Sequence, residues 1–398
     1  MLPSFNRIAL GLCVCMALAG CNVPQSEVAP AGMQRQASMP RANAGGQLGG
    51  SGKIQHVIVI VQEARSFDNL FCGYSGSDAS TCSSPAIPLE AKCRISDTFQ
   101  DFERDRKTGD FSHEKTDCPG YTRPQYGTVP RKETQPYRAI AQEYVLADHM
   151  FSSTGNPTFE SHQYYIAAQA DGINQPFGSA PSDGCVYQEQ VHQFNGPPRP
   201  ACADYQTLAS ELTAAGLTWA YYAAGRSEPT WDAFGWVKGY PGGTTPPAQF
   251  LKDVSSGHLD AVTWVTPELK DSDLSGSRSA TGPAWIASVV NAVGESSYWN
   301  TSAIFITWSG FGGWADHVPP KHVDRSGLGF RVPLLVVSPY AKQGYVSHVS
   351  FENGSILRFA EDRFALPPLA ASDSRANSPT DCFDFSQRPR AFVAIPTR

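Results

Sequence analysis

Two positions in this 398-residue chain carry acidic side chains directly after apolar segments, where chemistry is often placed. Glu63 follows the β-branched run 54–61, and Asp316 with His317 follows the apolar run 303–307 and a glycine-rich turn. In α/β sheets, ligands bind beyond the carboxyl ends of the strands. A carboxylate beside an imidazole can hold a divalent cation or move a proton. These residues therefore predict a metal site or an acid–base site.

The glycine-rich turn lacks some of the ligands that such a metal site needs. The positions that come first after the strand and its Trp308 are Ser309 and Gly310. Neither side chain can supply an anionic oxygen to a hard cation. We therefore expect a backbone arrangement typical of a metal site, but with an incomplete set of ligand side chains.

A third candidate is the hydroxyl-rich segment 148–164, which contains Thr158. A Ser or Thr hydroxyl becomes a competent nucleophile only when a base or a cation lowers its effective pKa. A nucleophile in this segment would therefore need Glu63, Asp316 and a metal nearby. The alternative is that these hydroxyls are turn and cap residues, as is common beside Gly and Pro.

Glu63 also has a structural interpretation. It can be a residue near the N-terminal dipole of a helix, with Arg65 and Asp68 forming a structural ion pair. Four other polar residues lie in polar contexts that favour surface roles over metal binding: His258, His322, Asp324 and His348.

The chain alternates between strand and helix patterns, which predicts an α/β fold with a parallel or mixed sheet. Its 41% hydrophobic content is enough for one large domain or two smaller ones. Strands are predicted at 54–61, 217–222, 261–265, 303–307 and 332–338. Helices are predicted at 137–147, 206–215, 284–293 and 355–364.

The N-terminus has the features of an export signal. Arg7 precedes an apolar run at 8–19 that is too short to span a bilayer. The residues that end at Cys21 resemble the lipobox of bacterial lipoproteins, in which this cysteine receives the lipid. We therefore predict a signal peptide at 1–20 and, because Pro, Gln, Ser, Ala and Gly dominate there, a flexible tether at 21–52.

Lipidation of Cys21 predicts that the protein is anchored in a membrane. Asn22 follows the cysteine, as in lipoproteins that are sent to the outer membrane, so we expect the domain on the periplasmic or surface face of that membrane. The alternative is an ordinary signal peptide that is cut elsewhere. The folded domain is expected at 53–398. Its net charge of −6 comes without a basic patch, which argues against nucleic acid as a partner.

Seven cysteines follow Cys21, so at least one is free or pairs externally. An oxidising compartment favours local disulfides, and the shortest loops join Cys72 to Cys82, Cys93 to Cys118 and Cys185 to Cys202.

The polar stretch 72–131 is expected to be a disulfide-pinned insertion over the edge of the sheet, with the charged residues 101–107 on a solvated face. The tail 371–398 is expected to be an irregular strap anchored by Phe383, Phe385 and Phe392.

Several of these segments together resemble a known family: 56–71, 146–164, 312–320 and 329–342. They are similar to the bacterial phosphoesterase family that contains the phosphatidylcholine-type phospholipases C and a class of acid phosphatases. The resemblance runs from about 53 to 395. It implies a three-layer sandwich, similar to alkaline phosphatases, with a mixed, mostly parallel central sheet. It also implies phosphoric ester hydrolysis in which a divalent metal of unknown identity activates a Ser or Thr nucleophile.

The resemblance assigns roles to matching residues. Glu63 and Asp316 match metal-ligand positions, Thr158 takes the place of the nucleophile, and His317 completes the closing Asp-His pair with a catalytic role. The expected substrates are phospholipids or phosphomonoesters.

Five positions depart from the family pattern. Ala64 stands where the family usually has Asn, and Leu274 stands where it often has His. Ser309 and Gly310 replace two acidic residues, and Ala315 stands where the family often has an aromatic residue. Two hypotheses follow. The chain is a phosphoric ester hydrolase, or it is a degenerate member that binds a ligand or partner without turnover.

Overall fold

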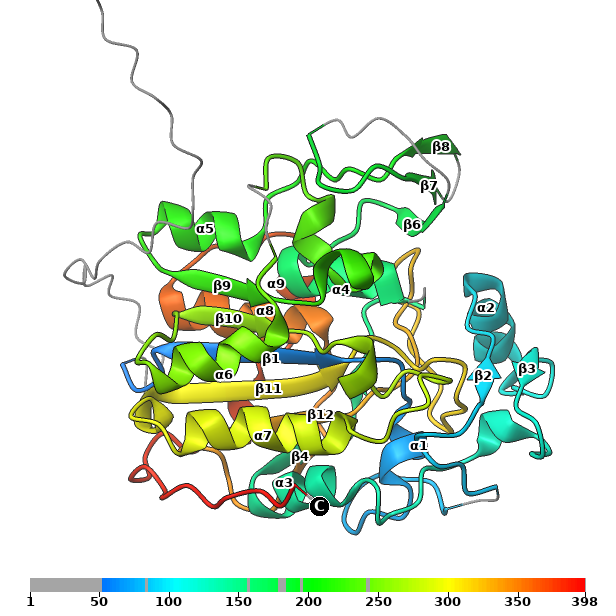
Figure 1. Cartoon of the computed structure of the whole chain (residues 1–398), viewed down its shortest axis with the longest axis horizontal. Helices are drawn as coiled ribbons and strands as arrows, with labels where there is room; N and C mark the ends of the chain where they lie inside the picture. The colour runs from blue at the N-terminus through cyan, green and yellow to red at the C-terminus, as the bar shows by residue number, and fades with distance from the viewer. Residues whose placement is uncertain are drawn as a thin grey trace, which may run out of the picture. The chain divides into compact units, whose positions relative to one another are not determined.

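The computed structural model describes residues 52–82, 85–155, 158–177, 184–193, 196–240 and 244–397 (Figure 1). Its core is a seven-stranded sheet with the order β13-β4-β12-β11-β1-β10-β9. Strand β12 is antiparallel to both of its neighbours, and the other pairs in this sheet are parallel. The sheet is therefore mixed and mostly parallel, as predicted. Its strands are β1 (His56–Gln62), β4 (Val145–Ala147), β9 (Trp219–Tyr222), β10 (Val262–Val265), β11 (Ser302–Trp308), β12 (Leu334–Val337) and β13 (Tyr345–Ser347).

Helices cover both faces of the sheet. In β11, the Phe305 ring lies 4.9 Å from Phe359 of α8, whereas the Trp308 ring lies 5.1 Å from Tyr137 of α3. Residues separated by an odd number of positions point to opposite faces of a strand, so α8 and α3 flank the sheet. This confirms the three-layer arrangement. One layer contains α3 (Gln135–Glu143), α6 (Pro247–Ser255) and α7 (Gly282–Gly294), and the other contains α4 (Thr158–Ala167), α5 (Leu208–Ala214), α8 (Asn353–Phe364) and α9 (Ala371–Arg375).

Strand β1 lies at the centre of the fold because its residues are apolar on both faces. Val57 to Val61 are at most 2% exposed, which suits a strand that has parallel partners on either side. Its register with β11 pairs Gln62 with Trp308. The residues that follow the two strands, Glu63 and Ser309, therefore leave the sheet side by side.

One predicted helix is wrong at its C-terminal end. The pattern 137–147 predicted a single helix, but α3 ends at Glu143 and residues 145–147 form strand β4. A short apolar run fits either structure, and pairing with β12 and β13 selects the strand. The other predicted helices and strands are present within two residues of their expected ends.

The three predicted disulfides are confirmed, at Cys72–Cys82, Cys93–Cys118 and Cys185–Cys202. Among the described residues, Cys382 is the cysteine outside a disulfide, and it is buried. The first two disulfides lie in the stretch 72–131, which follows α1 (Phe67–Phe71) and contains β2 (Arg94–Ile95), β3 (Thr116–Asp117) and α2 (Phe99–Thr108).

The expectation that 101–107 forms a solvated face is only partly correct. These residues lie in α2, where Phe102 and Asp105 are fully buried. The Phe102 ring packs 6.3 Å from Phe311 and 5.8 Å from Phe330, because the insertion folds back against the glycine-rich turn. Phe102 is thus an apolar anchor in a stretch whose other six residues are charged.

The described residues form three further small sheets, and in the first of them β2 pairs antiparallel with β3. Strands β5 (Met150–Phe151) and β14 (Phe351–Glu352) pair in parallel. An antiparallel sheet beyond α4 consists of β6 (Ile173–Phe177), β7 (Gln190–Gln193) and β8 (Gly196–Pro200) (Figure 1).

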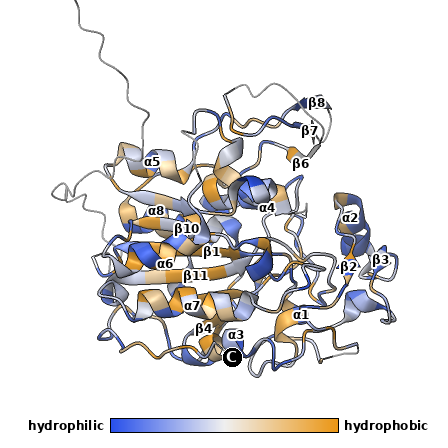
Figure 2. Ribbon diagram, in the orientation of Figure 1, coloured by the Kyte–Doolittle hydropathy of each residue, from blue (hydrophilic) through white to orange (hydrophobic). Residues whose placement is uncertain are grey.

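The tail packs as an anchored strap. After α9, the Phe383 and Phe385 rings stack at 5.1 Å, and Phe392 lies 5.0 Å from Trp299. Figure 2 shows α7 as largely apolar and α2 as largely polar, in keeping with their depths in the fold. Within the part of the chain that the structure describes, no helix combines the length and apolarity needed to cross a membrane. The predicted signal peptide, Cys21 and the tether up to residue 51 lie outside that part.

Candidate active site

Glu63 lies fully buried just beyond β1, and both of its carboxylate oxygens are occupied. Its Oε2 accepts a hydrogen bond of 2.7 Å from the Ser309 hydroxyl. Its Oε1 lies 2.7 Å from Nε2 of His162, which is only 2% exposed. The parallel register of β1 and β11 places Ser309 there, and α4 brings in His162.

Thr158 is the first residue of α4, and His162 lies four residues later in the same helix. Helical residues at this spacing share a face, one turn apart. Thr158 therefore lies on the face of α4 that carries His162 to Glu63, and it is partly exposed. The sequence analysis missed His162. Its spacing from Thr158, inside the hydroxyl-rich segment, was the available signal.

Ala64 holds an unusual backbone conformation at this corner. Its φ of 42° lies in the left-handed region, which alanine adopts at a cost of about 1–2 kcal/mol. Its N–H donates to the Ser309 hydroxyl oxygen at 3.3 Å. Gly312 packs so closely that a Cβ there would lie 2.5 Å from the Ala64 carbonyl oxygen. The turn after β1 is therefore fixed from two sides.

Asp316 and His317 belong to a neighbouring network around Arg331. The buried guanidinium donates from Nε to Asp316 Oδ1 at 2.8 Å and reaches Asp68 Oδ1 at 3.4 Å. His317 Nδ1 lies 2.7 Å from Asp68 Oδ2, and its Nε2 lies 3.2 Å from Asp78 Oδ1. The network is thus a chain of alternating acidic and basic groups.

Burial dominates the electrostatics of Asp316. Desolvation raises its pKa to about 6, although Arg331 opposes this increase. Burial disfavours the charged form of His317, but the hydrogen bond and the charge of Asp68 outweigh it and raise its pKa. A protonated His317 would therefore pair with Asp68.

The two clusters differ in how they could hold a divalent metal. Asp68, Asp316 and His317 offer ligand atoms that all lie within 4.8 Å of one another, which is compact enough for an ion, so this cluster is a candidate metal site. Arg331 contacts both carboxylates, and its single positive charge offsets one of their two negative charges. Around Glu63, both carboxylate oxygens are hydrogen-bonded, one to His162 and one to Ser309.

The predicted site residues consequently fall into two adjoining groups. Glu63 is held with His162 and Ser309, whereas Asp316 and His317 surround Arg331. The link between the groups is short, because the Ser66 hydroxyl donates to the carbonyl oxygen of Ala315.

The suggested ion pair between Arg65 and Asp68 is wrong. Arg65 donates from Nε to the Asp273 carbonyl oxygen at 2.7 Å and lies over the Trp314 ring. Asp68 is engaged instead by Arg331 and His317. Sequence proximity suggested the wrong partner, since the true one comes from a distant segment.

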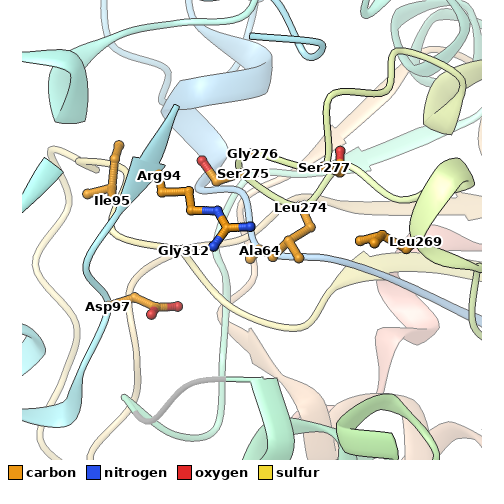
Figure 3. A pocket seen from close by; sticks show the side chains of 10 residues that line it. All are labelled: Ala64, Arg94, Ile95, Asp97, Leu269, Leu274, Ser275, Gly276, Ser277 and Gly312. Carbon is orange, nitrogen blue, oxygen red and sulfur yellow. The ribbon is translucent and has the colours of Figure 1, made fainter. Parts of the chain in front are cut away.

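A cavity of about 320 Å³ opens beside the Glu63 corner (Figure 3). Two of the positions that depart from the family pattern, Ala64 and Leu274, line it together with Gly312. The insertion contributes Arg94 and Asp97 to the wall. The substitutions thus border a pocket that a ligand can enter.

The residues expected at the surface have ordinary partners. His348 Nδ1 lies 2.8 Å from Asp148, and Asp324 pairs with Arg375. His258 hydrogen-bonds to the Ser256 hydroxyl. These contacts support structural roles.

Comparison with known proteins identifies a family whose model covers most of this chain. Residues 54–367 match the Phosphoesterase family, a range that includes both groups of site residues. Phospholipase C A of Mycobacterium tuberculosis is 21% identical over 418 residues, which cover 85% of this chain and 78% of the relative. The non-hemolytic phospholipase C of Pseudomonas aeruginosa is 23% identical over 437 residues, which cover 91% of this chain and 60% of the relative.

Solved structures with a related fold include a protein in the alkaline phosphatase superfamily from Vibrio parahaemolyticus. It is 12% identical, with a TM-score of 0.42, and the match covers 83% of this chain and 70% of that one. Murine ectonucleotide pyrophosphatase/phosphodiesterase 5 is 9% identical, with a TM-score of 0.45, and the match covers 83% of this chain and all of that one.

Proposed function

Because the chain belongs to the Phosphoesterase family, we propose that it is a phosphoric ester hydrolase that acts on phospholipid headgroups or phosphomonoesters. The observation that carries this proposal is the placement of Thr158 and His162 on one face of α4, with His162 held by Glu63 beyond β1. The names of the relatives, which are phospholipases C, support the substrate class.

The proposed reaction uses groups of the chain itself. When His162 donates from Nε2 to Glu63, its Nδ1 is left to accept a proton. The Thr158 oxygen attacks phosphorus and its proton passes to His162, while the bond from phosphorus to the ester oxygen breaks. His162 then gives the proton to the departing alkoxide. Water then attacks phosphorus and gives a proton to His162, and His162 passes a proton to the Thr158 oxygen as the bond between phosphorus and Thr158 breaks. The product is phosphate from a phosphomonoester and the phosphorylated headgroup from a phospholipid.

A second candidate function is ligand binding without turnover. The specific observation that favours it is the closure of the corner around Glu63. No ligand oxygen is available from the side chains of Ala64, Leu274 and Gly310. The Ser309 hydroxyl already donates a hydrogen bond to Glu63. A metal typically supplies several kcal/mol of transition-state stabilisation to this kind of chemistry, so its loss would lower the rate severely.

Turnover by the purified full-length protein separates the two candidates. We expect slow hydrolysis of a chromogenic phosphomonoester or a phosphocholine ester that does not require added divalent metal. Thr158→Ala should abolish it, whereas Thr213→Ala on α5 should not. Hydrolysis that appears only with added metal would sink the metal-free mechanism. An absence of hydrolysis with and without metal would leave the binding function.

We also propose that the protein is exported and lipid-anchored through Cys21, with the domain attached to the outer membrane. The apolar run and the lipobox-like residues support this location. Labelling with a radioactive fatty acid followed by membrane fractionation tests it. Label should be lost and the protein released in Cys21→Ser; equal labelling of both proteins would refute lipidation at this residue.

A further inference from the structure

The cavity beside Glu63 is built by two parts of the chain with different origins. Ala64, Leu274 and Gly312 come from the strand ends and turns of the sheet, and Arg94 and Asp97 come from the insertion. The loop Ser275 to Ser277 closes the remaining side. The insertion therefore adds charged groups to the corner where the family pattern has lost its ligands.

Arg94 brings a positive charge into this cavity without a partner in the described part of the chain. Figure 3 shows its guanidinium directed between Gly312, Ala64 and Leu274. Several other arginines of the domain lie in ion pairs with carboxylates: Arg104, Arg106, Arg331, Arg375 and Arg390. Others, such as Arg65 and Arg138, donate to backbone carbonyl oxygens. Arg94 is exposed where it lines the cavity, so its guanidinium is available to an anion from solution.

The position of Arg94 is fixed by its neighbours. It follows Cys93, which is disulfide-bonded to Cys118, and it pairs across β2 and β3 with Asp117. Its side chain lies over Gly276, where a Cβ would come within 2.6 Å of the Arg94 Cγ. This arrangement restrains the backbone of Arg94 and the first part of its side chain, which reduces part of the entropy that ligand binding would cost.

We propose that this cavity binds a phosphate group of the ligand and that Arg94 is the charge partner of that phosphate. Thr158 does not line the cavity, so this is a binding site beside the point of attack. A guanidinium offers planar, bidentate hydrogen bonds to phosphate oxygens. The apolar side chains of Ala64 and Leu274 cannot make such bonds. The inference rests on the proposed function for the identity of the ligand as a phosphate ester, but anion binding can be measured without turnover.

Asp97 provides an internal comparison because its charge has the opposite sign. Asp97 lines the same cavity as Arg94, and the charged groups that act on its carboxyl group are Asp101 and Glu63. Asp97 should repel a phosphate that Arg94 attracts. Removing one charge or the other should therefore shift affinity in opposite directions, which a general loss of structure would not do.

The test titrates inorganic phosphate into full-length protein by calorimetry, in a Thr158→Ala background that blocks turnover. Arg94→Gln should weaken phosphate binding by about tenfold or more, the loss expected for one charge-assisted contact. Asp97→Asn should strengthen it. Arg123→Gln is the matched control, since Arg123 belongs to the same insertion but stacks on Tyr126 and does not line the cavity.

Equal phosphate affinity in Arg94→Gln and its parent, or no phosphate binding by the parent, would overturn the inference. Hydrolysis by the unmodified protein reports separately on the proposed function. Arg94-dependent phosphate binding without hydrolysis keeps the inference and removes the hydrolase. Hydrolysis with a KM that is unchanged in Arg94→Gln keeps the hydrolase and removes the inference.

Discussion

Ser309 occupies a position where the family resemblance expects an acidic residue, and its hydroxyl forms two hydrogen bonds that hold the site together. It donates to Glu63 Oε2 and accepts from the N–H of Ala64. A buried carboxylate oxygen that loses its donor bears a desolvation penalty. Ser309 therefore supplies a neutral hydrogen bond that keeps Glu63 satisfied, at a position where the resemblance expects a charged ligand.

Ser309→Ala is accordingly expected to lower the free energy of unfolding by about 1–3 kcal/mol, because it leaves Glu63 Oε2 buried without its donor. Urea denaturation measures the change. Ser152→Ala is the matched control: the Ser152 hydroxyl is equally buried but has no hydrogen-bond partner among the described residues, so its removal should cost little. Equal losses in the two variants would refute this role for Ser309.

Restoring ligand oxygens should restore metal binding. In the double variant Ala64→Asn with Ser309→Asp, the new amide and carboxylate oxygens would lie beside Glu63. The negative charge of the two carboxylates would then exceed the single positive charge that His162 can offer. We expect a bound divalent ion in elemental analysis and a melting temperature that rises on addition of metal. The single variant Ser309→Asp should respond less. Absence of a metal response in the double variant would show that the corner cannot be rebuilt by these two residues.

At the scale of elements, the glycine-rich turn after β11 shows why the insertion and the sheet depend on each other. Gly313 has a φ of 75°, and a Cβ there would lie 2.5 Å from Ile95 Cγ2 and 2.6 Å from the Ser96 carbonyl oxygen. The turn thus fits against the chain around β2 only while this position is glycine. By contrast, a Cβ at Gly310 would meet nothing within 4 Å.

Gly313→Ala is therefore expected to destabilise the protein by about 1–3 kcal/mol, from backbone strain and from displacement of the insertion. Gly310→Ala should stay within about 0.5 kcal/mol of the parent, as surface substitutions usually do. Thermal unfolding of both variants gives the comparison. If the two substitutions had similar effects, the close packing of the turn would not contribute to stability.

Much of this fold follows from local patterns in the sequence. The buried strands were predicted because they are continuous apolar runs, and the disulfides because short loops close most readily. The boundary at Tyr144 was not predictable, since a three-residue apolar run at 145–147 carries no period. The helix α2 was also missed, because one buried Phe102 among charged residues gives only a weak pattern.

The site was less predictable than the fold because its partners are distant in sequence. Strand ends located Glu63 and Ser309, but no local signal linked Asp316 to Arg331 or directed Arg94 toward the cavity. Those contacts depend on how the insertion and the loops fold back over the sheet. The sequence suggested Asp316 as a metal ligand, and the structure places it with Asp68 and His317 in a cluster compact enough for an ion, but no local signal predicted that Arg331 would contact the same carboxylates.

At the scale of the whole molecule, buried carboxyl groups govern the response to pH. Burial raises the pKa of Glu361 to about 10, and the nearby Asp373 and Glu211 carboxyl groups add to the increase, while Arg358 opposes it. An unfolded Glu titrates near ~4.3. The folded protein therefore holds an extra proton between these values, and stability must fall as pH rises through this window.

We consequently expect the melting temperature to fall between about pH 5 and pH 9, since the unfolded state releases the Glu361 proton in that range. Glu361→Gln, which is uncharged at every pH, should flatten this slope. Differential scanning calorimetry across the range measures it. Parallel pH profiles of the variant and the parent would exclude Glu361 as a source of the dependence.

The left-handed conformation of Ala64 has a consequence for which side chains this turn can carry. Asparagine and glycine adopt that geometry more readily than alanine does. An asparagine could therefore replace Ala64 without a change in the main chain, and it would bring a side-chain oxygen to the corner beside Glu63.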